Sequence, residues 1–141
     1  MTDPSRHTGN PDESHSGLRV LLVDDEHQVL RALERVLRRF DTTAVDRAEV
    51  AESLLASESF DVVICDNSMP GKSGVDFLRT VAARHPCVHR VMHTGSAPQQ
   101  LSELQRDGVI ELFVPKPDWN ALVDFCDALC VDASTTAEDP R

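Results

Sequence analysis

The sequence predicts an α/β domain built on one parallel β-sheet of five strands, with helices covering both faces. Short and nearly continuous apolar runs, such as "VLLV" at 20–23 and "VVIC" at 62–65, are typical of strands buried on both faces. These runs alternate five times with segments whose apolar residues recur at helical spacing. Because crossovers between parallel strands are right-handed, five strand–helix units give a sheet with helices on both sides.

The predicted strands share an apolar or β-branched composition and are bounded by polar residues. They are expected at residues 18–23, 42–45, 61–65, 88–93 and 109–114. The second run is short and β-branched, which favours a place near the edge of the sheet. The flavodoxin-like strand order 2-1-3-4-5 then places the first and third strands side by side at the centre.

Five helices are predicted from apolar residues three or four positions apart. Their apolar positions are Val29, Leu33, Val36, Leu37 and Phe40 in the first, Val50, Leu54 and Leu55 in the second, Val75, Leu78, Val81 and Ala82 in the third, Leu101 and Leu104 in the fourth, and Leu122, Phe125 and Leu129 in the fifth. Ser73 and Asp118 are expected to cap the third and fifth helices. Pro98 suits the first turn of the fourth.

Length and composition predict one folded domain with two polar tails. The chain has 141 residues, and segments 1–17 and 132–141 hold too little apolar content to fold alone. We therefore expect disorder in both tails and a domain at residues 18–131.

The charge of the chain limits its partners. A net charge of −10 argues against direct contact with nucleic acid. One basic cluster lies on the first predicted helix and consists of Arg31, Arg35, Arg38 and Arg39. It is either a solvated helix face or a docking surface for an acidic partner.

The sequence also predicts a cytoplasmic protein without membrane contact. No apolar stretch approaches the roughly 20 residues of a membrane span, and the N-terminus lacks a signal-peptide pattern. The four cysteines show no disulfide-framework spacing, which suits a reducing compartment. A zinc site built on Cys87 with His85 and His89 is disfavoured, because Pro86 interrupts the run and free cysteine is usually buried.

Charged residues stand at the ends of three predicted strands. Asp24 and Asp25 follow the first strand, Asp66 follows the third, and Lys116 follows the fifth. Ligands of open parallel sheets bind beyond the carboxyl ends of the strands, so these groups are expected at one edge. Carboxylates at such short distances repel one another unless a hard cation lies between them. Oxygen ligands suit Mg²⁺. An acidic metal pocket beside a lysine is suited to receive a phosphoryl group.

Five motif elements in order resemble a known family. They are the Asp24-Asp25 pair, Asp66, the "MPG" at 69–71, Thr94, and the Lys116-Pro117 dipeptide. Over residues 18–131 the chain resembles the receiver domain of two-component response regulators. The resemblance implies that Asp66 accepts a phosphoryl group from a phosphohistidine of a sensor histidine kinase or a histidine phosphotransfer protein.

The resemblance also implies a metal site and a switch. Asp25 and Asp66 would bind Mg²⁺ with the main-chain carbonyl of Ser68, and Asp24 would act mostly through water. Lys116 would pair with Asp66 at rest and with a phosphoryl oxygen afterwards, and Pro117 permits a cis peptide bond. Thr94 would hydrogen-bond the phosphoryl group.

Phe113 matches the aromatic switch position of the family. The surface of the fourth helix, fifth strand and fifth helix would then alter binding of a downstream protein. The chain departs from the family at two points: Phe113 lacks the hydroxyl of the commoner tyrosine, and Gly95 stands where alanine or serine is commoner. Ser68 and Ser96 hold the positions that tune phosphoryl loss, and both are small and neutral, so access of water is not blocked.

The predicted function is a signalling switch and not an enzyme, although it would assist its own phosphorylation and dephosphorylation. The chain is expected to act as a stand-alone receiver without a DNA-binding output. Two alternatives remain: a phosphate-independent pseudo-receiver and the receiver fragment of a longer protein. A phosphatase with an aspartyl-phosphate intermediate is disfavoured, because such hydrolases need a carboxylate where this chain has Ser68.

Overall fold

The computed structural model describes residues 17–138, with side chains up to residue 130. Five strands form one parallel sheet in the order β2-β1-β3-β4-β5, which confirms the predicted topology. The strands are β1 (Arg19–Val23), β2 (Asp41–Val45), β3 (Val62–Cys65), β4 (His89–Thr94) and β5 (Leu112–Pro115). The sequence correctly predicted that all five strands exist and in which order they lie in the sheet.

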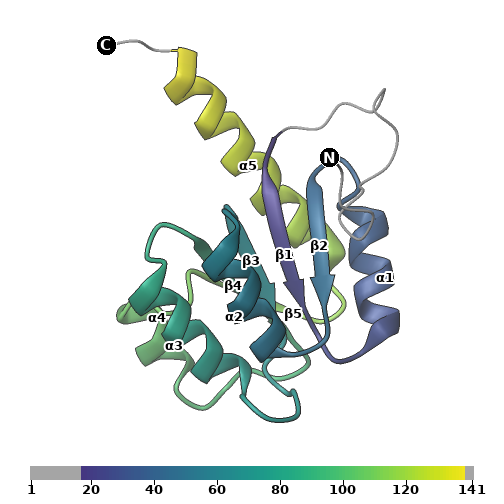
Figure 1. Ribbon diagram of the computed structural model, residues 1–141, viewed down its shortest axis with the longest axis vertical. Helices are drawn as coiled ribbons and strands as arrows, with labels where there is room; N and C mark the ends of the chain where they lie inside the picture. Colours follow the sequence, from purple (N-terminus) through teal and green to yellow (C-terminus); the bar gives the residue numbers. More distant parts are fainter. Residues whose placement is uncertain (1–16, 139–141) are drawn as a thin grey trace.

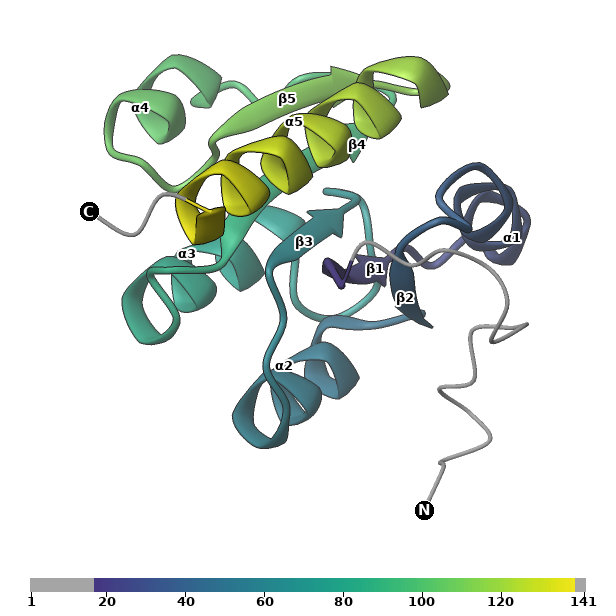
Figure 2. The same ribbon diagram turned by 90° about the horizontal axis from the view of Figure 1, so that it is seen from above.

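Five helices cover the two faces of the sheet. They are α1 (His27–Val36), α2 (Ala48–Ser57), α3 (Gly74–Arg84), α4 (Leu101–Arg106) and α5 (Trp119–Glu138). Helices α1 and α5 lie on one face, and α2, α3 and α4 lie on the other (Figures 1 and 2). Among the residues that the structure describes, none of these helices combines the length and apolar character needed to cross a bilayer.

Each face of the sheet has its own core, because successive side chains of a strand point to opposite sides. In β1, Leu21 and Val23 belong to the core under α2, α3 and α4. Their neighbours Val20 and Leu22 belong to the core under α1 and α5. Both cores exclude water almost completely, which fixes the register of the strands and hence the positions of their carboxyl ends.

Both predicted helix caps are present. The Ser73 hydroxyl accepts a hydrogen bond from the Asp76 N–H at 3.1 Å. The Asp118 carboxylate accepts one from the Ala121 N–H at 3.2 Å. Each cap satisfies a backbone donor in the first turn of its helix and so fixes where the helix begins.

Two predicted boundaries near the fourth helix were wrong. The strand expected at 109–114 begins only at Leu112, because the N–H groups of Val109 and Ile110 donate to the Leu104 carbonyl and close α4. Both residues are buried, so their apolar character reflects core packing without strand pairing. Pro98 also lies before α4 and not in its first turn: its carbonyl accepts the Leu101 N–H.

The last helix extends past residue 131, the predicted end of the domain. Helix α5 continues to Glu138, and its last turns project beyond the sheet (Figure 1). Extending a formed helix adds one backbone hydrogen bond per residue without a new nucleus, which offsets a polar composition. Residues 139–141 of the predicted C-terminal tail, and residues 1–16 of the N-terminal one, lie outside the described residues.

Candidate functional site

Strand pairing places the predicted carboxylates at one edge of the sheet. The Asp66 N–H donates to the Val23 carbonyl at 2.9 Å, so the end of β3 is held against the end of β1. The Asp24 N–H donates to the Val45 carbonyl at 3.2 Å. As a result, carboxylate oxygens of Asp24, Asp25 and Asp66 all lie within 4.8 Å of one another.

The three carboxylates differ in their surroundings. Asp24 and Asp66 are only 1% and 4% exposed, whereas Asp25 is exposed. Burial raises the pKa of the Asp24 carboxyl, and the Asp66 charge raises it further, while the Glu26 N–H and the Lys116 ammonium oppose this. Two buried carboxylates this close to one another favour binding of a positive charge.

Lys116 supplies one positive charge within this group. Its Nζ lies 2.9 Å from Glu26 Oε1, 3.0 Å from Asp24 Oδ2 and 3.4 Å from Asp66 Oδ1. Burial alone would lower the pKa of the ammonium, but the three carboxylates outweigh burial and hold that pKa above its usual value. The expected pairing with Asp66 is present, but it is the longest of the three contacts.

Glu26 is a site residue that the sequence reasoning missed. The signal was a third acidic residue directly after the Asp24-Asp25 pair, at the start of α1. The peptide bond between Lys116 and Pro117 is cis. The Lys116 N–H donates to the Thr94 carbonyl at 3.0 Å, which ties the ends of β4 and β5 together beside the carboxylates.

A pocket opens over this group and gathers almost all of the predicted site residues. Its lining residues are Asp25, Glu26, Asp66, Ser68, Thr94, Gly95, Ser96 and Lys116. Two predicted site residues are not part of the lining. Asp24 is buried, and Phe113 is half-buried in β5 and packs against the core under α2, α3 and α4. The pocket therefore combines carboxylates, hydroxyls and one ammonium around Asp66.

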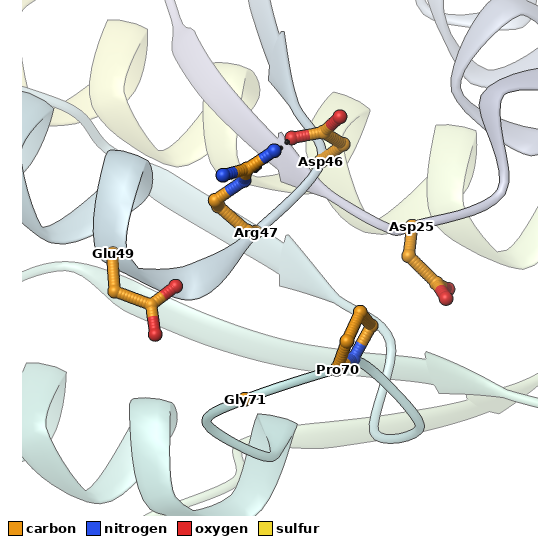
Figure 3. A pocket seen from close by; sticks show the side chains of 6 residues that line it. All are labelled: Asp25, Asp46, Arg47, Glu49, Pro70 and Gly71. Carbon is orange, nitrogen blue, oxygen red and sulfur yellow. Dashed lines mark hydrogen bonds and ion pairs between the residues drawn. The ribbon is translucent and has the colours of Figure 1, made fainter.

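A second pocket, shown in Figure 3, shares Asp25 with the first. It is lined by Asp25, Asp46, Arg47, Glu49, Pro70 and Gly71. Arg47 turns toward Asp46 and pairs with it at 3.2 Å (Figure 3). Hydrogen bonds from His27 and Arg47 lower the pKa of the Asp46 carboxyl. The charged side chains that line this second pocket are mostly acidic.

The donor set fits a hard divalent cation. Asp24 Oδ1 accepts the Glu26 N–H at 2.9 Å, but buried Oδ2 has no hydrogen-bond donor among the described residues. The Lys116 ammonium at 3.0 Å from Oδ2 forms an ion pair there without hydrogen-bond geometry. Carboxylate oxygens that converge with unfilled acceptor capacity are the ligands that Mg²⁺ prefers.

Gly74 is a second residue that the sequence reasoning missed. A Cβ atom at this position would lie 2.2 Å from the Asp66 carbonyl oxygen and 2.7 Å from the Asn67 Cα. The Gly74 N–H donates to the Asn67 carbonyl, and the Val75 N–H donates to Asn67 Oδ1. The start of α3 thus packs directly on the backbone of the residue that carries the central carboxylate.

His93 is buried behind Thr94 without polar partners. It is 1% exposed, and neither ring nitrogen has a hydrogen-bond partner among the described residues. Its ring centroid lies 5.5 Å from that of Trp119. Burial, and to a smaller extent the Lys116 charge, lower the pKa of the imidazole to about 4, against the opposing charges of Asp66 and Asp118.

Comparison with known families agrees with this geometry. The family model described as the response regulator receiver domain matches residues 20–125. The chain belongs to the response regulator receiver domain family. It is therefore a receiver domain of two-component, phosphorylation-based signalling.

Curated relatives are response regulators. The chain is 32% identical over 97 residues to the chemotaxis protein CheY of Pseudomonas aeruginosa, covering 67% of this chain and 74% of that protein. It is 40% identical over 77 residues to the hydrogenase transcriptional regulatory protein HoxA of Cupriavidus necator, covering 54% of this chain and 16% of HoxA. The alignments span only 16% to 23% of the length of the first curated regulators that the chain matches.

Solved structures share the fold. A CheY-like receiver domain protein from Methanospirillum hungatei superposes with a TM-score of 0.76 at 19% identity, covering 85% of this chain and 98% of that one. The response regulator TrrA from Thermotoga maritima, in complex with Mg²⁺ and a beryllium fluoride, gives 0.71 at 23% identity, covering 79% and 98%. At these identities the likeness concerns the fold alone.

Proposed function

We propose that Asp66 accepts a phosphoryl group from a phosphohistidine of a sensor histidine kinase or a histidine phosphotransfer protein. One observation carries the proposal: the buried Asp66 carboxylate lies within 4.8 Å of two further carboxylates and 3.4 Å from the Lys116 ammonium. The pocket over it opens to solvent beside Ser68, Thr94 and Ser96, so a donor can approach. The chain would act as a phosphoacceptor that assists its own phosphorylation and dephosphorylation, and not as an enzyme with a separate substrate.

The chemistry is nucleophilic substitution at phosphorus. An Asp66 carboxylate oxygen attacks, a P–O bond forms, and the P–N bond to the donor imidazole breaks. The electron pair of that bond stays on the imidazole nitrogen, which then gains a proton. The product is an acyl phosphate on Asp66. Small, neutral Ser68 and Ser96 leave room at the pocket mouth for the donor and later for water.

We propose Asp24, Asp25, Asp66 and the main-chain carbonyl of Ser68 as the Mg²⁺ site, with Asp24 acting mostly through water. When bound, Mg²⁺ would supply positive charge to the phosphoryl oxygens in the loose transition state. Lys116 supplies a further positive charge from the protein itself. Its ammonium would exchange Asp66 for a phosphoryl oxygen once the group has been transferred.

We propose that Thr94 and Phe113 pass this change to a binding surface. The Thr94 hydroxyl would hydrogen-bond the phosphoryl group, and its carbonyl already accepts the Lys116 N–H. Because this hydrogen bond links Thr94 to Lys116, a shift of either residue would move the ends of β4 and β5 jointly. Phe113 in β5 is half-buried and would respond. The surface of α4, β5 and α5 would then change its affinity for a downstream protein.

The proposed setting is the cytoplasm, without direct contact with nucleic acid or membrane. Four cysteines are free, of which Cys87 is exposed and Cys130 half-buried. Free thiols persist in a reducing compartment. The net charge of −10 disfavours binding to the phosphates of a nucleic acid or of an anionic bilayer.

The proposal is tested by mass spectrometry of the intact protein. Wild type and Asp66→Asn are incubated with acetyl phosphate and Mg²⁺, and the gain of one phosphoryl group is measured. We expect the gain in wild type only. Wild type that stays unmodified, while binding its partners regardless, would indicate a phosphate-independent pseudo-receiver instead.

Asp25→Ala is expected to weaken Mg²⁺ binding by at least about tenfold, because it removes a carboxylate that we assign as a direct ligand. Isothermal titration calorimetry measures the affinity. Glu49→Gln is the control, since it removes an exposed charge from the adjoining pocket without touching the three carboxylates. Equal Mg²⁺ affinities for Asp25→Ala and wild type would show that Asp25 is not a ligand.

A further inference from the structure

Lys116 has three carboxylate partners, and the nearest of them, Glu26, is neither the proposed phosphoacceptor nor a proposed Mg²⁺ ligand. Its Nζ donates a hydrogen bond to Glu26 Oε1 at 2.9 Å, whereas Asp66 Oδ1 is 3.4 Å away. Lys116 is 16% exposed and the Glu26 side chain 61% exposed. The lysine that is proposed to meet the phosphoryl group is therefore held at rest partly by an exposed carboxylate of the pocket lining, together with buried Asp24 at 3.0 Å.

The backbone of Glu26 is held by hydrogen bonds, whereas its carboxylate does not cap the helix. The Glu26 N–H donates to Asp24 Oδ1, and its carbonyl accepts the N–H groups of Val29 and Leu30 at the start of α1. Although Glu26 is the N-cap residue of α1, its side chain makes no capping hydrogen bond. The carboxylate is thus directed at Lys116 from a fixed point, and its exposure makes the contact weak enough to break.

We infer that Glu26 is a positioning residue that restrains Lys116 and slows phosphoryl uptake by Asp66. This rests on the proposed function. To contact an arriving phosphoryl oxygen, the Lys116 ammonium has to give up its hydrogen bond to Glu26 or divide its N–H donors between Glu26 and the phosphoryl oxygen. Glu26 also lines the same pocket, so its negative charge disfavours an anionic donor at the mouth. Both effects slow the transfer of a phosphoryl group to Asp66.

Glu26→Gln tests this, because it removes the charge and keeps the length of the side chain. The initial rate of phosphorylation by acetyl phosphate at saturating Mg²⁺ is measured by intact mass. We expect a rate about threefold to tenfold above wild type, the range of a partly exposed charge contact. Glu49→Gln is the matched control: it removes the same charge from the second pocket, away from the carboxylates that pair with Lys116, and should leave the rate close to wild type.

A double-mutant cycle separates the lysine contact from a simple charge effect. If Glu26 acts mainly through Lys116, Glu26→Gln accelerates wild type clearly more than it accelerates a Lys116→Met background, where only the charge effect on the donor remains. The same acceleration in both backgrounds would overturn the positioning role. A Glu26→Gln rate equal to that of Glu49→Gln, in a protein that does take up phosphate, would overturn the inference while leaving the proposed function intact. Absence of uptake in wild type and every variant would overturn both.

Discussion

Gly74→Ala is expected to lower the free energy of unfolding by about 3 kcal/mol or more, because its Cβ meets backbone atoms that cannot rotate away. The new atom would lie 2.2 Å from the Asp66 carbonyl oxygen and 2.9 Å from its carbon. Relief requires α3 to move away from the end of β3, which also displaces Asp66. Urea denaturation of the variant measures the loss, and phosphorylation by acetyl phosphate is expected to fall with it.

Gly95→Ala is the matched control for this experiment. Gly95 lies in the pocket lining after β4, and a Cβ there meets no atom within 4 Å. The same substitution should therefore change the free energy of unfolding by less than about 0.5 kcal/mol. A Gly74→Ala protein as stable as Gly95→Ala would contradict the close packing of α3 on the Asp66 backbone.

Acidification is expected to destabilise the protein through His93. The pKa of the buried imidazole is lowered to about 4, below its ordinary value of 6.5, so between these values the unfolded chain binds the proton more readily than the folded one. Proton binding by the unfolded chain therefore costs no stability above pH 6.5, and it lowers the free energy of unfolding as the pH falls towards 4. Between pH 7 and pH 5 this loss amounts to about 2 kcal/mol.

His93→Leu removes the proton-binding group and should remove this part of the pH dependence. Two unpaired ring nitrogens are also lost, so the variant should be at least as stable as wild type at pH 7. Urea titrations at pH 7 and pH 5 give the difference. Met92→Leu, a buried neighbour in β4, controls for a general disturbance of the strand and should keep the wild-type pH dependence. An unchanged slope in His93→Leu would assign the acid sensitivity elsewhere.

The sheet was predictable because buried strands and amphipathic helices leave separate patterns in the sequence. The order of the strands then placed Asp24, Asp25 and Asp66 at one edge without any knowledge of side-chain contacts. The start of β5 was not predictable in this way. Val109 and Ile110 are buried and apolar like strand residues, but their N–H groups serve the end of α4.

The residues around the carboxylates were harder to predict than the carboxylates themselves. Glu26 becomes important only when the chain between it and Lys116 has folded, since the two residues lie 90 positions apart. Gly74 looks like an ordinary glycine near a helix start, and only the approach of the Asp66 carbonyl explains why a side chain is excluded there. His93 follows the apolar residues Val91 and Met92 in β4, and this pattern does not reveal that the ring lacks polar partners.

Locating the modified residue tests the assignment of Asp66 most directly. Protein treated with acetyl phosphate and Mg²⁺ is reduced with borohydride, which converts an acyl-phosphorylated aspartate into homoserine, and the peptides are sequenced by mass spectrometry. We expect homoserine at position 66 and nowhere else in the pocket. Homoserine at position 24 or 25, or an unmodified Asp66 in protein that has gained a phosphoryl group, would contradict the proposal that Asp66 is the acceptor.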